Sequence, residues 1–252
     1  MPRLRHLPVQ IRRAIRLRPG LRFFAREVLV RRTVTRGYVV RRTGQVVTLR
    51  HRTPDLGGFV EVFINGNYDM PAAVRQSLEG LQRPLRVVDL GANIGLFGLS
   101  LLSQQPTAVI TAVEPDPSNA AVLHRTIDAN GRSDTWSVIE ACAGTQDGVV
   151  PFRAGQFLES RIADDGEPTV VRDVFPMLAD ADLIKMDIEG AELELLSDRR
   201  FAALPARVLW LEFHPPHGEH EIVSLVQRAG FRPGPITRRG GCGEFWAIRR
   251  AL

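Results

Sequence analysis

Charged side chains interrupt a short apolar stretch near residue 187, where acid–base chemistry could take place. The stretch from Leu183 to Glu189 predicts a β-strand whose alternation puts Lys185, Asp187 and Glu189 on one face. Central strands exclude charge unless it is paired or functional. Asp187 is therefore a candidate proton acceptor, and Lys185 is a candidate to stabilise negative charge developing on a substrate oxygen.

Lys185 is the only lysine in a chain that contains 32 arginines. A compact ammonium group, whose pKa shifts readily on burial, is not interchangeable with a planar guanidinium group. The alternative is a buried ion pair between Lys185 and Asp187 that only tethers the strand to the following loop. The sequence leaves both roles open.

His214 is the third candidate catalytic residue. It ends another predicted strand, residues 208–214, on which Glu212 shares its face, and two prolines follow it. An imidazole has an unperturbed pKa near neutrality and can act as a general base. A purely structural histidine is the alternative.

A glycine-rich stretch at residues 87–98 predicts the binding site that would position this chemistry. A buried strand leads into a turn containing Gly91, Asn93 and Gly95, and leucines at helical spacing follow. Such a unit builds a ligand crevice at the carboxyl end of a parallel sheet. A dinucleotide fingerprint would carry glycine at position 93, and Asp89 at the strand's end would repel pyrophosphate. The pattern favours a ligand with an amino group and no phosphate, such as S-adenosylmethionine (SAM).

Two further strand ends supply candidate cofactor contacts. Glu114 follows the predicted strand 108–113 and is placed to accept hydrogen bonds from ribose hydroxyls. Asp116 either contacts the cofactor as well or caps the helix that begins at Pro117. Cys142, after the predicted strand 136–141, either forms a wall for adenine or is an inert core residue.

Together these motifs resemble those of a known enzyme family. Asp89-x-Gly91-x-Asn93-x-Gly95, Glu114-Pro115-Asp116 and the block from Ile184 to Glu192 are similar to those of the FkbM family of SAM-dependent methyltransferases. The resemblance covers roughly residues 50–250, and it does not name the substrate. It implies a class I methyltransferase fold, SAM as the cofactor and methylation of a hydroxyl group on a small molecule, as in natural product biosynthesis.

The expected fold is α/β and Rossmann-like: a mostly parallel, doubly wound sheet with an antiparallel last strand near residues 245–248. We expect the methyltransferase core to span residues 85–252, after a basic helical arm at 1–36 and a hairpin and cap segment at 37–84. A hairpin insertion is predicted near residues 146–152, with a polar loop at 153–168 beside the substrate entrance.

The cap segment has a pattern typical of strands. Residues 38–40 and 46–49 flank a Thr43-Gly44 turn, and a third strand is predicted at 59–64. By the family resemblance, Asp55 and Tyr68 are polar positions of a segment that helps to cover the cofactor. An edge hairpin without ligand contact is the alternative.

The N-terminal part of the chain has a large excess of positive charge. Residues 1–52 contain fifteen arginines and one acid, Glu27, whereas the net charge of the whole chain is +5. Apolar residues suggest one stripe of an amphipathic helix: Leu4, Leu7, Ile11, Ile15 and Leu21. Such an arm either contacts an anionic membrane or acidic partner, or is a solvated helix packed on the catalytic domain. Nucleic acid is disfavoured, because few aromatic residues are available to stack on bases.

Composition excludes several classes of protein. No apolar stretch is long enough to span a bilayer, and the N-terminus lacks the apolar core of a signal peptide. Two cysteines form neither a disulfide framework nor a metal-binding spacing, so we expect a cytoplasmic protein. Asp187 and Glu189 are close enough to suggest a divalent metal ion, but nothing else resembles a complete site for a hard cation, so no metal ion is expected. The oligomeric state stays open, a homo-oligomer included.

Two alternatives to a methyltransferase belong to other functional classes. A nicotinamide-dependent oxidoreductase on a Rossmann fold is disfavoured by Asp89 and Asn93. A non-enzymatic adaptor that binds a membrane or a partner through its arm is disfavoured by the charged block around Lys185.

Overall fold

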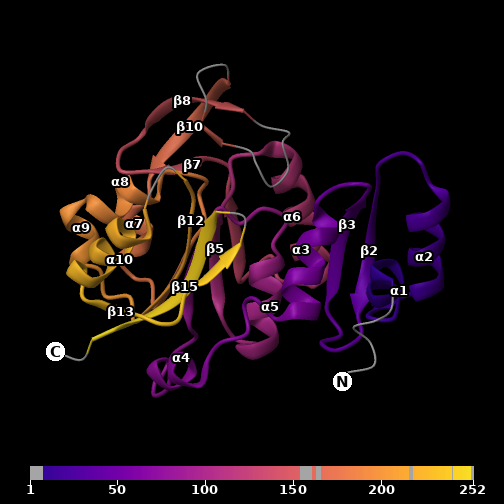
Figure 1. The fold of residues 1–252 in the computed structure, drawn as a ribbon, viewed down its shortest axis with the longest axis horizontal. Helices are drawn as coiled ribbons and strands as arrows, with labels where there is room; N and C mark the ends of the chain where they lie inside the picture. The colour runs from indigo at the N-terminus through magenta and orange to yellow at the C-terminus, as the bar shows by residue number, and fades with distance from the viewer. Residues whose placement is uncertain (1–7, 154–160, 163–165, 216–217, 240, 251–252) are drawn as a thin grey trace.

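The computed structural model describes residues 8–153, 161–162, 166–215, 218–239 and 241–250, and a mixed eight-stranded sheet lies at its centre (Figure 1). The strand order is β13-β15-β12-β11-β4-β5-β6, and β14 pairs with β15. The bounds are β4 Arg86–Leu90, β5 Val109–Val113, β6 Trp136–Ile139, β11 Leu183–Met186, β12 Val208–Phe213, β13 Phe231–Pro233, β14 Thr237–Arg239 and β15 Cys242–Arg249.

The strand directions confirm the predicted fold class. β4 pairs in parallel with β5 and β11, and β11 pairs in parallel with β12. β15 runs antiparallel to β12, as expected of the last strand. The register places Lys185 of β11 opposite Asp89 of β4, so the two predicted site residues are neighbours across the strands.

Helices cover both faces of this sheet because its strands are apolar on both sides. Successive residues of β4 point to opposite faces, and Val87 and Val88 belong to two different hydrophobic clusters. One cluster includes helices α5 Leu96–Gln104 and α6 Pro117–Ala129. The other cluster includes α7 Phe175–Leu178, α8 Glu192–Ser197, α9 Arg199–Ala202 and α10 Glu219–Arg228. A short helix, α4 Ala72–Ser77, precedes the first strand of the sheet.

The N-terminal part contains the predicted hairpin but not the predicted single helix. Strands β2 Val34–Val40 and β3 Val46–His51 pair antiparallel, and β1 Leu17–Arg18 extends them to three strands. The chain before and after β1 forms two short helices, α1 Val9–Ala14 and α2 Gly20–Leu29.

The apolar stripe expected on the arm is not a buried face. Pro19 precedes α2 and separates it from α1, and a residue without a backbone N–H cannot continue a helix. Leu21 and Ile15 are exposed, Phe23 is buried instead, and Leu4 and Leu7 lie outside the described residues.

The strand predicted at 59–64 is wrong. Helix α3 Asp55–Val60 and the π-helical turn η2 Glu61–Asn65 occupy this segment. β-branched and aromatic residues favoured a strand, but the buried ones recur at helical spacing: Leu56, Phe59, Val62 and Phe63. The Arg50 guanidinium also binds the Asp55 carboxylate at 2.8 Å, which fixes the start of α3.

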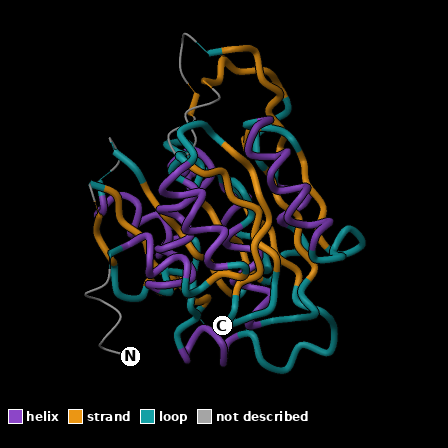
Figure 2. The backbone as a smooth tube through the Cα atoms, turned by 90° about the vertical axis from the view of Figure 1, so that its right-hand side faces the viewer, coloured by secondary structure: helices purple, strands orange, loops and turns teal. Residues whose placement is uncertain are grey.

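A second, smaller sheet projects beside the central one, with the strand order β7-β10-β8-β9 (Figure 1, Figure 2). Its strands are β7 Cys142–Gly144, β8 Gly148–Arg153, β9 Arg161–Ile162 and β10 Glu167–Asp173. The hairpin insertion predicted near residues 146–152 contains β8, but β10 was not predicted, and its first two residues were assigned to the loop at 153–168. Most of that loop, residues 154–160 and 163–165, lies outside the described residues. Within the described part of the chain, no helix is both long and apolar enough to cross a membrane.

Candidate active site

A cavity lies at the carboxyl ends of β4, β5, β11 and β12, where a doubly wound sheet binds its ligands. Six of the ten predicted site residues line it: Gly91, Asn93, Glu114, Cys142, Lys185 and Asp187. The other four lie just behind this lining or beside it: Asp89, Gly95, Asp116 and His214. The sequence pattern therefore placed most of its candidate residues at the edge of the sheet where the cavity lies.

The turn after β4 needs glycine because other segments approach it closely. Gly91 has a φ of +76°, and a Cβ atom there would overlap the carbonyl oxygen of Asp187. Gly95, with a φ of +85°, packs beneath the Trp136 ring. Two glycines thus let the turn pass tightly between the loop after β11 and the indole. Asn93 adopts a left-handed φ of 50°, which asparagine tolerates better than most residues.

Lys185 fastens this turn to the sheet. Its ammonium group donates to the carbonyl oxygens of Leu90 and Gly91, at 3.2 and 2.5 Å. It also lies 3.3 Å from a carboxylate oxygen of Asp89 and 3.5 Å from one of Asp187. Burial alone would lower the pKa of Lys185, but the two carboxylates outweigh burial and raise it. A charged ammonium therefore neutralises Asp89 inside the protein.

A residue that holds the amino group of SAM would be expected to line the cavity, but Asp89 does not. Its side chain has no exposed surface and does not belong to the cavity lining. Strand register explains this placement, because Asp89 lies opposite Lys185 on the neighbouring strand. The positive group that Asp89 contacts in this structure is the lysine ammonium.

Glu114 lies at the end of β5, on the cavity wall, as the sequence predicted. Its carboxylate accepts hydrogen bonds from the backbone N–H of Asn93 at 2.7 Å and of Asp116 at 2.9 Å. Burial raises the pKa of Glu114 to about 7, although these hydrogen bonds oppose the shift. A carboxylate with this pKa changes charge near neutral pH, so ligands that need its ionised form should bind in a pH-dependent way.

Asp116 has the capping role that was its alternative. Its carboxylate accepts hydrogen bonds from the backbone N–H of Ser118 at 2.8 Å and of Asn119 at 3.4 Å. Pro117 occupies the first helical position, as expected after an N-cap. Asp116 therefore helps to position Glu114 by starting α6, and it stands outside the cavity lining.

Cys142 forms part of the cavity wall and is almost fully buried. Burial, with a smaller contribution from the Glu114 charge, raises the pKa of the Cys142 thiol to about 12. The thiol is therefore neutral at physiological pH, as an apolar wall requires.

His214 follows β12 and is held by Glu192, a buried residue that sequence reasoning gave no separate role. Nδ1 of His214 lies 3.0 Å from Oε1 of Glu192, and a carboxylate only accepts, so Nδ1 carries the proton. Burial would lower the pKa of His214, but Glu192 and the surrounding carboxylates raise it to about 9. The sequence did indicate that Glu192 could belong to the site, since this residue ends the charged block that begins at Lys185.

The cap segment covers the cavity, although as a helix rather than a strand. Asp55, Glu61 and Tyr68 all belong to the cavity lining. The Tyr68 ring packs edge-on against Phe97 and Trp210, with ring centroids 5.0 and 4.8 Å away. The cap is therefore held against the core by aromatic contacts, and Asp55 and Tyr68 both line the cavity.

Comparisons with known proteins show which family this chain resembles. The methyltransferase FkbM domain family matches residues 89–233. A curated relative, "Methyltransferase sdnD" of Sordaria araneosa, is 29% identical over 195 residues, covering 60% of this chain and 74% of the relative.

Solved structures are similar at the level of the fold. A SAM-dependent methyltransferase from Agrobacterium tumefaciens has a TM-score of 0.51 at 14% identity, over 85% of this chain and 69% of the other. M. jannaschii TYW2 in complex with AdoMet has a TM-score of 0.47 at 14% identity, over 88% and 90% of the two chains. With the family match covering more than half of the sequence, the chain belongs to the FkbM family of SAM-dependent methyltransferases.

Proposed function

We propose that this enzyme transfers a methyl group from SAM to a hydroxyl group of a small molecule. One observation carries the proposal: the cavity brings together the glycine turn, Glu114 and Asp187 at the carboxyl edge of the sheet. The turn and Glu114 would hold the cofactor, and Asp187 would face the acceptor. Lys185 would keep the turn in place through its bonds to Leu90 and Gly91.

The donor SAM supplies a methyl group on a positively charged sulfur, and this sulfur keeps the electron pair of the broken carbon–sulfur bond. In our proposal Asp187 takes the proton of the acceptor hydroxyl while the oxygen forms its bond to the methyl carbon. Asp187 is favoured over His214 as proton acceptor because Asp187 lines the cavity and His214 does not. Most of the rate would come from alignment of the two reactants in a site that excludes water.

The acceptor class can be tested with SAM that carries a labelled methyl group. Panels of sugars, polyketides and other hydroxylated metabolites are compared with matched amines and carboxylic acids. We expect label transfer to hydroxyl compounds only. Transfer confined to amines or carboxylic acids would contradict O-methylation while leaving the methyltransferase assignment intact.

We also propose that the arm docks on an anionic lipid surface. Leu21, Phe24 and Val28 share one face of α2 and are 87, 37 and 53% exposed, with Leu29 beside them at 74%. Arginines are exposed close to these residues, at positions 18, 22, 31, 32 and 36. An exposed apolar face bordered by positive charge suits a negatively charged membrane surface.

Sedimentation with phosphatidylserine vesicles tests this docking. We expect full-length protein to bind at low salt, to dissociate as salt rises, and to ignore phosphatidylcholine vesicles. Replacing Leu21 and Leu29 with serine should weaken binding roughly 10-fold or more, because two apolar side chains lose their burial. The matched control replaces Val149 and Val170, which are 66 and 44% exposed on the smaller sheet, with serine.

Equal binding by both double variants, or no binding by the parent protein at low salt, would contradict docking by the arm. A cytoplasmic location and a homo-oligomer stay predictions.

A further inference from the structure

The ring of His214 is fixed so that its second nitrogen faces a group of acidic side chains. Glu192, which has no exposed surface, accepts the Nδ1 hydrogen bond at 3.0 Å. The same carboxylate accepts hydrogen bonds from the backbone N–H of Ile188 at 3.3 Å and of Gly190 at 2.9 Å. One buried residue therefore sets the tautomer of His214 and the shape of the loop beside it. A carboxylate bound to the far nitrogen is how proteins commonly orient a metal-binding histidine.

The oxygens around Nε2 are too distant for hydrogen bonds. The nearest carboxylate oxygens of Asp187, Glu189 and Glu212 lie 3.8, 3.6 and 3.8 Å from Nε2. A hydrogen bond from an N–H group would bring an oxygen to about 2.7–3.2 Å. Ligands bound at about 2.1 Å to one tetrahedral metal ion lie roughly 3.4 Å from one another. The observed spacing of 3.6–3.8 Å is that of loose ion pairs, and it is also close to the spacing between the ligands of one metal ion.

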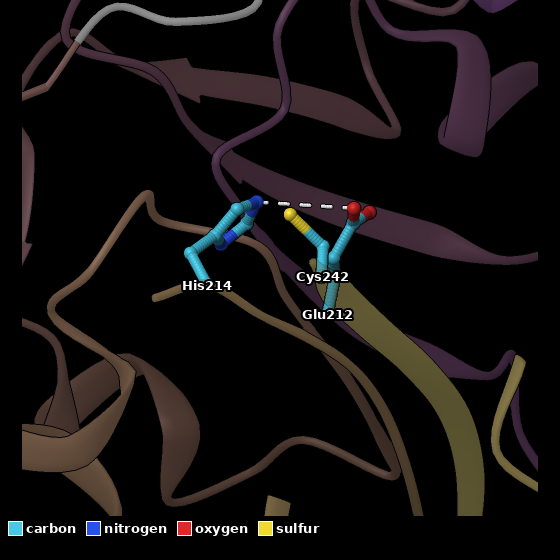
Figure 3. A group of neighbouring side chains, drawn as sticks. All are labelled: Glu212, His214 and Cys242. Atoms are coloured by element: carbon cyan, nitrogen blue, oxygen red, sulfur yellow. Dashed lines mark ion pairs between the residues drawn. The ribbon is translucent and has the colours of Figure 1, made fainter. Parts of the chain in front are cut away.

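Cys242 adds a sulfur atom to this group from a distant part of the chain. It begins β15, whose antiparallel pairing with β12 places Gly243 opposite Phe213. The next positions along the two strands are Cys242 and His214, and their side chains converge with that of Glu212 (Figure 3). Ligand atoms of Glu212, His214 and Cys242 all lie within 4.8 Å of one another.

We propose that Glu212, His214 and Cys242 bind one divalent transition-metal ion, with Zn²⁺ as the best match. A nitrogen, a carboxylate oxygen and a thiolate sulfur form a ligand set typical of zinc, whereas Mg²⁺ and Ca²⁺ require oxygen ligands. Three protein ligands leave a fourth position open, as in catalytic zinc sites. Glu212 and Cys242 both line the cavity, so that position faces the ligand site.

The open position has a role if the proposed O-methylation is correct. A metal ion there could bind the acceptor oxygen and ease the loss of its proton to Asp187. This role rests on the proposed function, but the metal site rests on geometry alone. The sequence did not predict the site, because Cys242 follows His214 only after 28 residues and the three ligands form no recognised metal-binding spacing.

The competing ligand set uses the same histidine. Asp187, Glu189 and His214 also have ligand atoms within 4.8 Å of one another. A single Nε2 atom can bind only one ion, so the two sets exclude each other. Without sulfur, the second set would be better suited to Mn²⁺. Cys242 is a metal ligand only in the first set, so replacing Cys242 distinguishes the two possibilities.

The test is metal binding by tag-free, full-length protein after chelator treatment. Calorimetric titration with Zn²⁺, Mn²⁺ and Mg²⁺ should show one Zn²⁺ per chain, and much weaker binding of Mg²⁺. His214→Ala and Cys242→Ser should each weaken Zn²⁺ binding at least about 100-fold, since each removes a direct ligand. Co²⁺ added in place of Zn²⁺ should give a thiolate-to-cobalt absorption band that Cys242→Ser abolishes. His124→Ala, at a histidine paired with the exposed Glu140, is the matched control.

Several results would overturn the proposal: no stoichiometric Zn²⁺ binding by the parent protein, or equal binding by all variants. Loss of binding in His214→Ala but not in Cys242→Ser would indicate that Asp187, Glu189 and His214 bind the ion instead. Melting temperature and SAM affinity are measured on every preparation, so a variant that does not fold is recognised. If His214→Ala is unfolded, the cobalt band of the parent and Cys242→Ser proteins decides alone. SAM binding without metal binding would overturn this inference and leave the methyltransferase function standing.

Discussion

Lys185→Met is expected to lower the melting temperature by about 6–20 °C and to weaken SAM binding. Removing one partner of a buried ion pair costs about 3–5 kcal/mol, because the remaining charge stays buried without compensation. In a domain of this size, each kcal/mol lowers the melting temperature by about 2–4 °C. Asp89 is that remaining charge, since it has no exposed surface and lies 3.3 Å from the ammonium group.

Weaker SAM binding follows from the loss of two hydrogen bonds. The ammonium group of Lys185 donates to the carbonyl oxygens of Leu90 and Gly91, which begin the glycine turn. Lys185→Arg keeps the charge but places a larger planar group in a site enclosed by these carbonyls. Lys185→Arg should therefore also lower the melting temperature and weaken SAM binding, but its loss of stability should be smaller than that of Lys185→Met.

The competing hypothesis gives Lys185 a direct catalytic role in stabilising negative charge on the acceptor oxygen. Under that hypothesis Lys185→Arg would fold normally and bind SAM like the parent, while turnover would fall about 100-fold or more. Melting temperature, SAM affinity and turnover measured on the same preparations separate the two roles. Arg86→Met is the control, because Arg86 starts the neighbouring strand and its half-exposed side chain pairs with the exposed Asp180.

Glu114→Gln is expected to weaken SAM binding about 10- to 100-fold at pH 8, the scale of losing hydrogen bonds to a charged acceptor. The parent protein should also lose affinity as the pH falls from 7.5 to 5.5. Burial raises the pKa of Glu114 to about 7, so acid converts the carboxylate into a neutral acid that accepts hydrogen bonds poorly. Glu114→Gln cannot titrate, and its affinity should be almost independent of pH across that range.

Glu140→Gln is the matched control for Glu114→Gln. Glu140 follows the next strand of the sheet, but its side chain is exposed and pairs with His124. Parental affinity and parental pH dependence are expected for this control. Unchanged SAM affinity in a folded Glu114→Gln protein would remove Glu114 from the cofactor site.

The central sheet and the glycine turn could be predicted because their signals are local in the sequence. The apolar run before Gly91 and the leucines after Gly95 mark a buried strand and a buried helix. The acid at the end of β5 was identified from its distance along the chain to the turn. Parallel strands bring such positions to one edge, so most candidate residues proved to be neighbours.

Features that depend on long-range packing could not be predicted in the same way. The segment of α3 and η2 is rich in β-branched and aromatic residues, and only its burial against the core makes it helical. The pairing of Lys185 with Asp89 depends on which strands lie side by side and in which register. Cys242 reaches His214 only through the antiparallel return of β15 along β12. None of these relations is visible in spacing along the chain.

Calorimetric titration of the full-length protein with SAM and with NAD tests the central claim most directly. The site has Asn93 where a dinucleotide fingerprint has glycine, whereas Glu114 on the cavity wall could accept hydrogen bonds from the ribose of either ligand. We expect one SAM per chain and no measurable heat from NAD, with S-adenosylhomocysteine competing for the SAM site. Binding of NAD, or no binding of SAM by the folded protein, would contradict the account.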